Sequence, residues 1–465
     1  MLFLHHLSKR KILTAGILLS TTNLAQAALQ PVGPEYLVNT TSSGYEATPL
    51  IANSSDNNTL IVWTSEAAYA ESGSSIMGQF YNQYGEAEGA EKTLVGLSAN
   101  IARISEQDNY AHIAMTSWPD GRFALAWSTE GDALNEFESE YDMVLQFFNA
   151  DGTADGDVIT VADTSDREAM PSLASNNTGL IIAWQSYPTS DTKELKVNTL
   201  KYRRYSKNGN SLTAAPIIVN STASNLGNQP SAALSEDNIA LITWATNAQG
   251  KAVEGSSPDY RVNAALFATN DNPINSSITL DAMDGADTPS EVHAITLNNT
   301  DFLAAWDSGI DGSRNPRART ISATGNQGEL IESQTSGDDV ISGVTKDQDG
   351  NAFVAWNRSE YGERTLYTQH VTINGAVGSP VQVSTYTDPE ENNAALLVDS
   401  DGVLTIAWES WITNDDDAPD IYARRFNVTN QPPATKEEGG SSGGGGAPAT
   451  ILLGILATLV FRRKQ

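Results

Sequence analysis

The chain has 465 residues, 40% of them hydrophobic, and its 57 acidic residues against 27 basic ones give a formal net charge of −30 at pH 7. Such a chain repels nucleic acids and anionic lipid surfaces, so its composition argues against nucleic-acid binding. Cysteine is absent, and stability must therefore come from packing rather than disulfides. Abundant Gly, Asn, Ser and Thr favour a β-protein with many turns.

The N-terminus has the pattern of a secretion signal. Lys9 to Lys11 supply positive charge, Ile12 to Leu19 form a short apolar run, and Ala25-Gln26-Ala27 fits the small-x-small cleavage pattern. We expect residues 1–27 to be a signal peptide cut between Ala27 and Ala28. The alternative is an uncleaved N-terminal anchor, for which the apolar run is short.

One phrase recurs seven times in the body of the chain: a turn of Asn, Asp or Gly, then an apolar run, then Trp. Successive copies lie 50 to 64 residues apart. The tryptophans are Trp63, Trp127, Trp184, Trp244, Trp306, Trp356 and Trp408. Periods of this length indicate a repeat architecture, which has to be recognised before any short motif is interpreted.

Each copy lies in a unit of four short strand-like segments separated by polar turns. In the unit of Trp184 these are Pro171-SLAS, the run ending at Trp184, Leu200-KYRRYS and Ile217-IVNS. Four such strands form an antiparallel meander, which is the blade of a β-propeller. We therefore predict an all-β fold over residues 28–429: a seven-bladed β-propeller of four-stranded antiparallel blades.

The two ends of the array support a ring. The last unit lacks a fourth strand and runs into Pro432-Pro433, while the first unit is preceded by a spare strand at Glu35-YLVN. We expect Glu35–Asn39 to pair with Ile421–Asn427, so that the N-terminal strand closes the ring and leaves no bare edge. An open solenoid would need capping repeats at both ends instead.

The repeated tryptophans end strands that are apolar throughout, as in Leu180-IIAW, a pattern typical of strands buried on both faces. Core packing between neighbouring blades therefore explains them better than a ring of sugar-stacking aromatics. Trp118 and Trp411 stand outside the pattern. They are candidates for exposed ligand contact, with packing as the alternative.

Function is expected on the face that carries the long loops between the second and third strands, because variable loops usually hold binding residues. Acidic residues clearly outnumber basic ones there. Two loops dominate, and their carboxylates suit Ca²⁺, a cation that takes six to eight oxygen ligands. The candidate ligand-binding acids are Glu136, Glu138 and Glu140, and the candidate metal ligands are Asp415, Asp416, Asp417 and Asp420. The alternative is a solvated acidic surface that keeps the protein soluble.

A second candidate Ca²⁺ loop is formed by Asn149, Asp151 and Asp155 in the segment NADGTADGD. It lacks the bidentate Glu twelve positions along. The alternative is a plain turn with Gly152 and Gly156 at positive φ.

Enzyme signatures are sparse. The body holds only three widely separated His and no Cys, and the GxSxG at Gly439–Gly443 lies in a linker with no strand before it. The sequence favours a non-enzymatic surface propeller that binds a glycan, a protein or a cation-bridged ligand through its acidic loop face. The alternative is a secreted carbohydrate-active hydrolase or lyase that uses loop carboxylates.

The C-terminus has three parts: a Pro/Gly/Ser-rich linker over residues 430–449, an apolar segment within residues 450–465, and a terminal basic cluster. Gly443 to Gly446, Ile451 to Phe461 and Arg462 to Lys464 in this order resemble the GlyGly-CTERM sorting signal of Gram-negative bacteria. The resemblance implies a short apolar helix in the membrane, recognition by a rhomboid-type sorting protease, and passage to the cell surface by type II secretion. A plain C-terminal anchor is the alternative, and either way the body is expected outside the cytoplasm.

Overall fold

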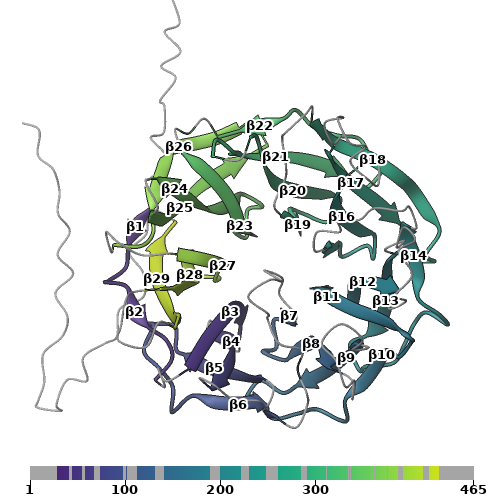
Figure 1. The fold of residues 1–465 in the computed structure, drawn as a ribbon, viewed down its shortest axis with the longest axis horizontal. Helices are drawn as coiled ribbons and strands as arrows, with labels where there is room; N and C mark the ends of the chain where they lie inside the picture. Colours follow the sequence, from purple (N-terminus) through teal and green to yellow (C-terminus); the bar gives the residue numbers. More distant parts are fainter. Residues whose placement is uncertain are drawn as a thin grey trace, which may run out of the picture.

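The computed structural model describes residues 29–40, 44–54, 58–67, 74–97, 101, 113–130, 141–188, 199–220, 230–247, 260–283, 291–310, 312–333, 335, 337–360, 363–373, 375–385, 391–411 and 418–428. Its regular elements are all β-strands, and the sheets stand around a ring (Figure 1). Within this described part of the chain, no helix has the length and apolarity to cross a bilayer. The expected signal peptide with its cleavage site at Ala27 and Ala28, and the expected C-terminal helix, lie outside the described residues.

Each copy of the tryptophan phrase lies in its own set of antiparallel strands, and we number these sets repeats 1 to 7. Repeat 1 holds β3 (Gly44–Asn53), β4 (Thr59–Ala67), β5 (Ser75–Tyr81) and β6 (Lys92–Val95). Repeat 2 holds β7 (Ile113–Ser117), β8 (Phe123–Glu130), β9 (Tyr141–Phe148) and β10 (Ile159–Ala162). Repeat 3 holds β11 (Asp166–Ser175), β12 (Gly179–Pro188), β13 (Thr199–Ser206) and β14 (Ile217–Asn220). A single parallel pairing of Arg167 with Tyr141 joins repeats 2 and 3 into one eight-stranded sheet.

The second half of the ring follows the same order. Repeat 4 holds β15 (Ser231–Leu234), β16 (Ala240–Asn247), β17 (Tyr260–Phe267) and β18 (Pro273–Met283). Repeat 5 holds β19 (Val292–Thr296), β20 (Asp301–Ser308), β21 (Asn315–Ser322) and β22 (Ile331–Glu332). Repeat 6 holds β23 (Asp338–Lys346), β24 (Ala352–Glu360), β25 (Glu363–Thr372) and β26 (Gly375–Gln382). Repeat 7 holds β27 (Glu391–Val398), β28 (Val403–Ser410) and β29 (Asp420–Asn427).

The first strands that Figure 1 labels, β3, β7, β11, β19, β23 and β27, lie on the inner side of the ring. Consecutive first strands contact one another, and β27 of repeat 7 contacts β3 of repeat 1. Serine hydroxyls bridge some of these neighbours: the Ala232 amide donates to Ser172 Oγ at 3.0 Å, and the Ala294 amide donates to Ser231 Oγ at 2.8 Å. Ser172 on β11 and Ser231 on β15, each preceded by a proline, thus satisfy amides of the next repeat.

The repeated tryptophans fill the space between repeats. Six of the seven side chains are at most 1% exposed, and Trp244 is 8% exposed. Each belongs to a hydrophobic cluster; Trp127, for example, packs with Leu60 and Val62 of the preceding repeat. Each indole buries a large apolar area, so these residues are the main filler between sheets that diverge outward. Their role is packing, as the apolar pattern of the second strands indicates.

The N-terminal segment completes the last sheet. β2 (Tyr36–Leu37) pairs antiparallel with β29, with Tyr36 opposite Ala423 and Leu37 opposite Tyr422. β1 (Gln30–Pro31), which the sequence did not predict, extends the pairing with Gln30 opposite Asn427. The sheet of repeat 7 therefore has five strands, two of them from the other end of the described chain.

Two equivalent arginines join neighbouring repeats: Arg204 joins repeats 3 and 4, and Arg425 joins repeats 7 and 1. Arg204 donates to Ala268 O and Asn238 O and forms an ion pair with Asp271 at 2.6 Å, which fixes a turn of repeat 4. Arg425 occupies the equivalent place in repeat 7 and donates to Gln83 O at 2.7 Å, in a turn of repeat 1. The junction between the two ends of the chain thus uses an interaction that also operates inside the array.

Candidate functional site

A buried carboxylate recurs beside the tryptophan, on the first strand of several repeats. In repeat 1, Trp63 Nε1 donates to Glu46 Oε2 at 2.6 Å and Ser65 Oγ donates to Glu46 Oε1 at 2.9 Å. In repeat 3, Trp184 Nε1 donates to Glu168 Oε2 at 2.5 Å and Ser186 Oγ donates to Oε1 at 3.1 Å. Strand register places each carboxylate opposite the residue two positions after its tryptophan, which brings the three groups together.

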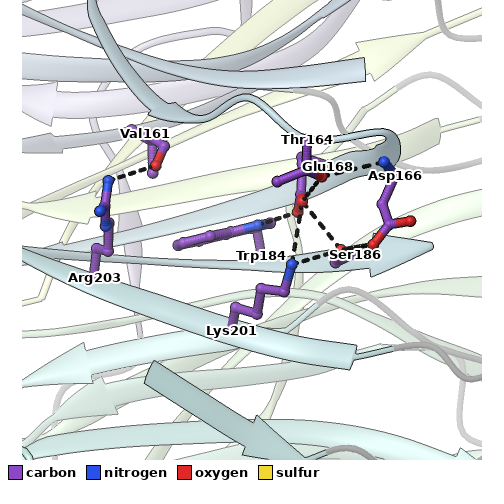
Figure 2. A network of polar contacts seen from close by, with 8 residues as sticks. All are labelled: Val161, Thr164, Asp166, Glu168, Trp184, Ser186, Lys201 and Arg203. Carbon is purple, nitrogen blue, oxygen red and sulfur yellow. Dashed lines mark hydrogen bonds and ion pairs between the residues drawn. The ribbon is translucent and has the colours of Figure 1, made fainter. Parts of the chain in front are cut away.

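The equivalent position on the first strand is also acidic in repeat 6, where it is Asp339, and in repeat 7, where it is Glu391. The partners of these acids differ between repeats. Lys201 Nζ lies 3.2 Å from Glu168 in repeat 3 (Figure 2), and Arg358 Nε lies 2.8 Å from Asp339 in repeat 6. Among the described residues, Glu46 in repeat 1 and Glu391 in repeat 7 form no ion pair. A cation therefore compensates the buried charge at two of the four positions only.

The two acids without an ion-pair partner have raised pKa values. Burial raises the pKa of Glu46 to about 7, although hydrogen bonds from Ser65 and Trp63 act in the opposite direction. Burial likewise raises the pKa of Glu391 to about 8. A carboxyl group removed from water without a cationic partner favours its neutral form. These two groups thus change charge near neutral pH.

Strained backbone follows the carboxylate in three repeats. Thr48, Met170 and Asn393 each lie two positions after the acid and have φ of +54°, +56° and +41°. Each lies at a break in strand register, between the first and second strands of its repeat. Non-glycine residues reach the left-handed region only where the surroundings hold them there, so these bulges are specified positions.

In repeats 1 and 7 a single buried carboxylate holds two of these bulges. Glu409 Oε1 accepts hydrogen bonds from the Thr48 amide at 2.6 Å and from Asn393 Nδ2 at 2.8 Å. Burial raises the pKa of Glu409, because its effect exceeds the opposite effect of the two hydrogen-bond donors. Because Thr48 belongs to repeat 1 and Asn393 to repeat 7, Glu409 fixes the relative position of the two inner strands.

Two aromatic side chains meet where repeats 7 and 1 adjoin. Trp411 directly follows β28 and is half-buried, and Tyr45 on β3 is 39% exposed. Their ring centroids lie 5.6 Å apart at an interplanar angle of 75°, an edge-to-face arrangement. The backbone is fixed at the same place, since the Glu46 amide donates to Pro419 O at 3.2 Å. We call Tyr45, Trp411, Glu66 opposite Tyr45 in strand register, and Asp420 at the start of β29 the junction site.

Two of the predicted site residues, Trp411 and Asp420, come together here. Asp420 Oδ1 accepts a hydrogen bond from Asn39 Nδ2 at 2.7 Å, and Asn39 Oδ1 accepts the Ile421 amide at 2.8 Å. The Asp420 carboxylate thus ties the N-terminal segment to β29. Sequence reasoning missed Tyr45, and the only signal for it was its place just before the first strand's buried acid.

Trp118 is not an exposed ligand contact. Its side chain is 2% exposed, its Nε1 donates to Asn176 O at 2.8 Å, and its ring stacks on Phe147 with centroids 5.9 Å apart. Lys207 Nζ lies over the same ring at 5.7 Å. The indole is enclosed between repeats 2 and 3, and its role is packing, the alternative that the sequence left open.

Asn149, Asp151 and Asp155 form a hairpin turn. Asp151 Oδ1 accepts bonds from the Thr153 amide at 2.9 Å and Thr153 Oγ1 at 2.6 Å. Gly152 has φ of +83°, and Asp155 lies 3.9 Å from Arg122. The oxygens face local donors and a cation rather than a common centre, so this segment is a turn between β9 and β10.

The remaining predicted ligands lie outside the described residues. These are Glu136, Glu138, Glu140, Asp415, Asp416 and Asp417. Within the part of the chain that the structure describes, no group of three or more His, Cys, Asp or Glu side chains is arranged to hold a metal ion. The proposed role of Ca²⁺ in the acidic loops therefore stays a prediction.

Neither a protein-family model nor a curated relative matches the sequence. Among solved structures, puromycin hydrolase is similar with a TM-score of 0.55 and 12% identity, over 87% of this chain and 57% of that one. A protein of unknown function from Dyadobacter fermentans is similar over 86% of this chain and 99% of that one, at 7% identity and a TM-score of 0.49. The alpha-L-arabinofuranosidase of Fusarium graminearum is similar over 85% and 98%, at 11% identity and a TM-score of 0.46.

This chain thus spans little more than half of puromycin hydrolase. At such identities the similarity concerns the fold alone. The all-β architecture of antiparallel four-stranded sheets and the likeness to puromycin hydrolase define a protein with a fold of the β-propeller type.

The raised pKa of Glu46 makes stability depend on pH. A carboxyl group whose pKa is raised by folding stabilises the native state fully below its unfolded value, near 4.5, and this contribution is lost as pH rises through about 7. We expect Glu46→Gln to gain about 1–3 kcal/mol of unfolding free energy relative to the unmodified protein between pH 4.5 and 8. Chemical unfolding curves across this range measure the difference.

Glu168→Gln is the matched control. It removes the same carboxylate from repeat 3, where Lys201 compensates it, so it should destabilise the protein at pH 7. If the stability difference between Glu46→Gln and the unmodified protein were the same at pH 4.5 and pH 8, Glu46 would not titrate as the structure indicates.

Proposed function

We propose that this chain is an exported, surface-sorted, seven-bladed β-propeller that binds a glycan through its loop face. In this proposal repeats 1 to 7 are the blades, and the N-terminal strands close the ring. The pairing of β1 and β2 with β29, the contact of β27 with β3, and the Arg425 link to the turn of repeat 1 support the closed ring.

The observation that carries the binding role is the pair Tyr45 and Trp411. Large aromatic side chains are normally buried, and the seven repeated tryptophans follow that rule. Tyr45 and Trp411 instead remain partly open to solvent, at a junction where hydrogen bonds fix both flanking strands. Rigid aromatics with nearby polar oxygens are the groups that bind the apolar face and the hydroxyls of a sugar.

The carbohydrate-active hydrolase or lyase remains the second candidate, and one observation favours it. The pKa of Glu46, about 7, is suited to a general acid at neutral pH. Both oxygens of Glu46, however, accept hydrogen bonds from Trp63 and Ser65, and the side chain is 2% exposed. A protonated acid in this position stabilises the core of repeat 1 more directly than it could serve a bound substrate.

Binding is tested on a glycan array with the folded body of the protein. We expect selective binding, and we expect Trp411→Ala to weaken it by about tenfold or more, because loss of a central aromatic contact removes much of the binding energy. Leu212→Ala, at a side chain 62% exposed on repeat 3, is the surface control and should leave binding unchanged.

Two results would contradict the binding role. One is the absence of any bound glycan on the array, with or without calcium. The other is cleavage of a polysaccharide that Glu46→Gln abolishes, which would establish the enzyme alternative.

Export and sorting are part of the same proposal and rest on the two ends of the sequence. The C-terminal segments from Gly443 to Lys464 resemble the GlyGly-CTERM signal, which implies a rhomboid-type protease and type II secretion. We expect protein from the cell surface to begin at Ala28 and to end near the glycines, as measured by intact mass. A surface form that retains Ile451 to Phe461 would instead indicate a plain anchor.

A further inference from the structure

We propose that Glu46 is a pH-sensitive latch for the N-terminal segment, residues 29–40: the segment stays on β29 while this carboxyl group is neutral and opens more readily once the carboxylate forms. The inference is independent of the ligand proposed above. It follows from the place of Glu46 between repeat 1 and the segment that completes the sheet of repeat 7, and from the groups that surround this carboxyl group.

Glu46 lies where the N-terminal segment covers repeat 1. Its hydrogen-bond donor Trp63 packs in one hydrophobic cluster with Val38 of that segment. In repeat 3 the equivalent tryptophan, Trp184, packs with Val161 of β10, the outer strand of the preceding repeat. The N-terminal segment thus takes the place of an outer strand, but its two strands, β1 and β2, have only two residues each.

Carboxylates hold the end of this segment next to Glu46. Asp420 Oδ1 accepts Asn39 Nδ2 at 2.7 Å, and Glu91 Oε2 accepts the Thr40 amide at 3.0 Å. Among the described residues, these two acids are the charged groups that act on Glu46 most strongly, and both raise its pKa. Ionisation of Glu46 therefore adds a further negative charge, in a buried site, beside two acids that bind the segment.

The elements that pack against Glu46 contribute hydrogen bonds and neutral groups. Trp63 and Ser65 of β4 donate to its carboxyl group. On β5 the register partner of Trp63 is the uncharged Met77. On the N-terminal segment the titratable group is Tyr36, whose pKa is raised to about 12 by burial, so that it stays neutral near pH 7.

The other charged groups of this part of the ring are engaged elsewhere. Glu409 of β28 accepts the Thr48 amide at 2.6 Å. Arg425, near the C-terminal end of β29, donates to a carbonyl in a turn of repeat 1, and Lys92 of β6 donates to a carbonyl of repeat 2. Among the described residues, neither cation forms an ion pair with Glu46.

Repeat 3 shows the same position with its charge compensated. There the register partner of Trp184 is Lys201, whose Nζ lies 3.2 Å from Glu168 (Figure 2). A carboxylate with a cationic partner favours its charged form, whereas Glu46, which has Met77 at the equivalent position, must stay neutral or gain water. Water enters where local opening is easiest, and the short strands of the N-terminal segment are the most weakly held cover of this site.

Amide hydrogen exchange of the intact protein at pH 6 and pH 8.5 tests the latch. Protection factors are compared, because they remove the base catalysis of exchange itself. The pKa of Glu46, raised from 4.5 to about 7, stabilises the closed state at pH 6, and this stabilisation is lost at pH 8.5. We expect protection of the Val38 amide, which donates to Ile421 O at 2.7 Å, to fall about tenfold. Strands β12 and β13 of repeat 3 should keep their protection.

A substitution on β5 tests the charge logic directly. Met77→Lys places a cation where repeat 3 has Lys201 and should remove most of the pH dependence, leaving the segment protected at pH 8.5. Met77→Leu is the matched control and should retain the fall in protection. Glu46→Gln requires no buried lysine, cannot ionise, and should also abolish the pH dependence.

Three results would overturn the latch. One is equal protection of residues 29–40 at the two pH values. Another is a fall of the same size in repeat 3, which would show that the whole molecule opens rather than the segment. The third is a full pH dependence that persists in Glu46→Gln, which would assign the titration to another group.

Discussion

The pairing of the N-terminal strands with β29 is the interaction on which the rest of the structure depends. It brings Tyr36 opposite Ala423 and thereby places the first repeat beside the last. The hydrogen bonds from the Thr48 amide to Glu409 and from the Glu46 amide to Pro419 join the same two repeats. The junction site therefore exists only in the folded ring, since its two aromatic residues come from opposite ends of the array.

The buried carboxylates distinguish the junction from the rest of the ring. Glu168 and Asp339 have cationic partners, and their charge is compensated inside the protein. Glu46 and Glu391 have raised pKa values, about 7 and about 8, because burial disfavours the charged form. The same sequence position thus holds half of an ion pair in repeats 3 and 6 and, among the described residues, a buried carboxyl group without an ion-pair partner in repeats 1 and 7. Because folding raises the pKa of Glu46 and of Glu391, the stability of repeats 1 and 7 is expected to fall as pH rises through neutrality.

Much of the fold could be predicted from the sequence, because the tryptophan repeat and the apolar second strands report burial directly. The all-β class, the four-stranded antiparallel sets and the packing role of the tryptophans all follow from these local patterns. The bulges at Thr48 and Met170 could not be predicted, since neither residue type favours positive φ; Asn393 is of a type that enters this region readily, but its sequence context does not single it out. β1 was missed because two residues at an edge carry no periodic signal.

The candidate site was predictable only in part. Trp411 and Asp420 were identified individually, by their departure from the repeat and by their charge, but their proximity depends on pairing between distant segments. Trp118 was offered as a ligand contact by the same criterion, yet its ring is enclosed by Phe147 and Asn176, which sequence distance conceals. The partners of Glu46 and Glu409 depend on strand register, and one residue of slip would send each side chain to the opposite face.

The absence of cysteine in the chain allows a direct measurement of the central pairing. Leu37 and Tyr422 are register partners on β2 and β29, and opposed residues of antiparallel strands have Cα atoms about 4.5–5.5 Å apart, within the range that a disulfide spans. If the two ends pair as described, the double variant Leu37→Cys, Tyr422→Cys should form an intrachain disulfide on oxidation. Its unfolding temperature should then be higher than in the reduced state, while oxidation should not change that of either single variant. Thiols that stay free in the oxidised, folded double variant, or that link only different molecules, would contradict the pairing and with it the junction site.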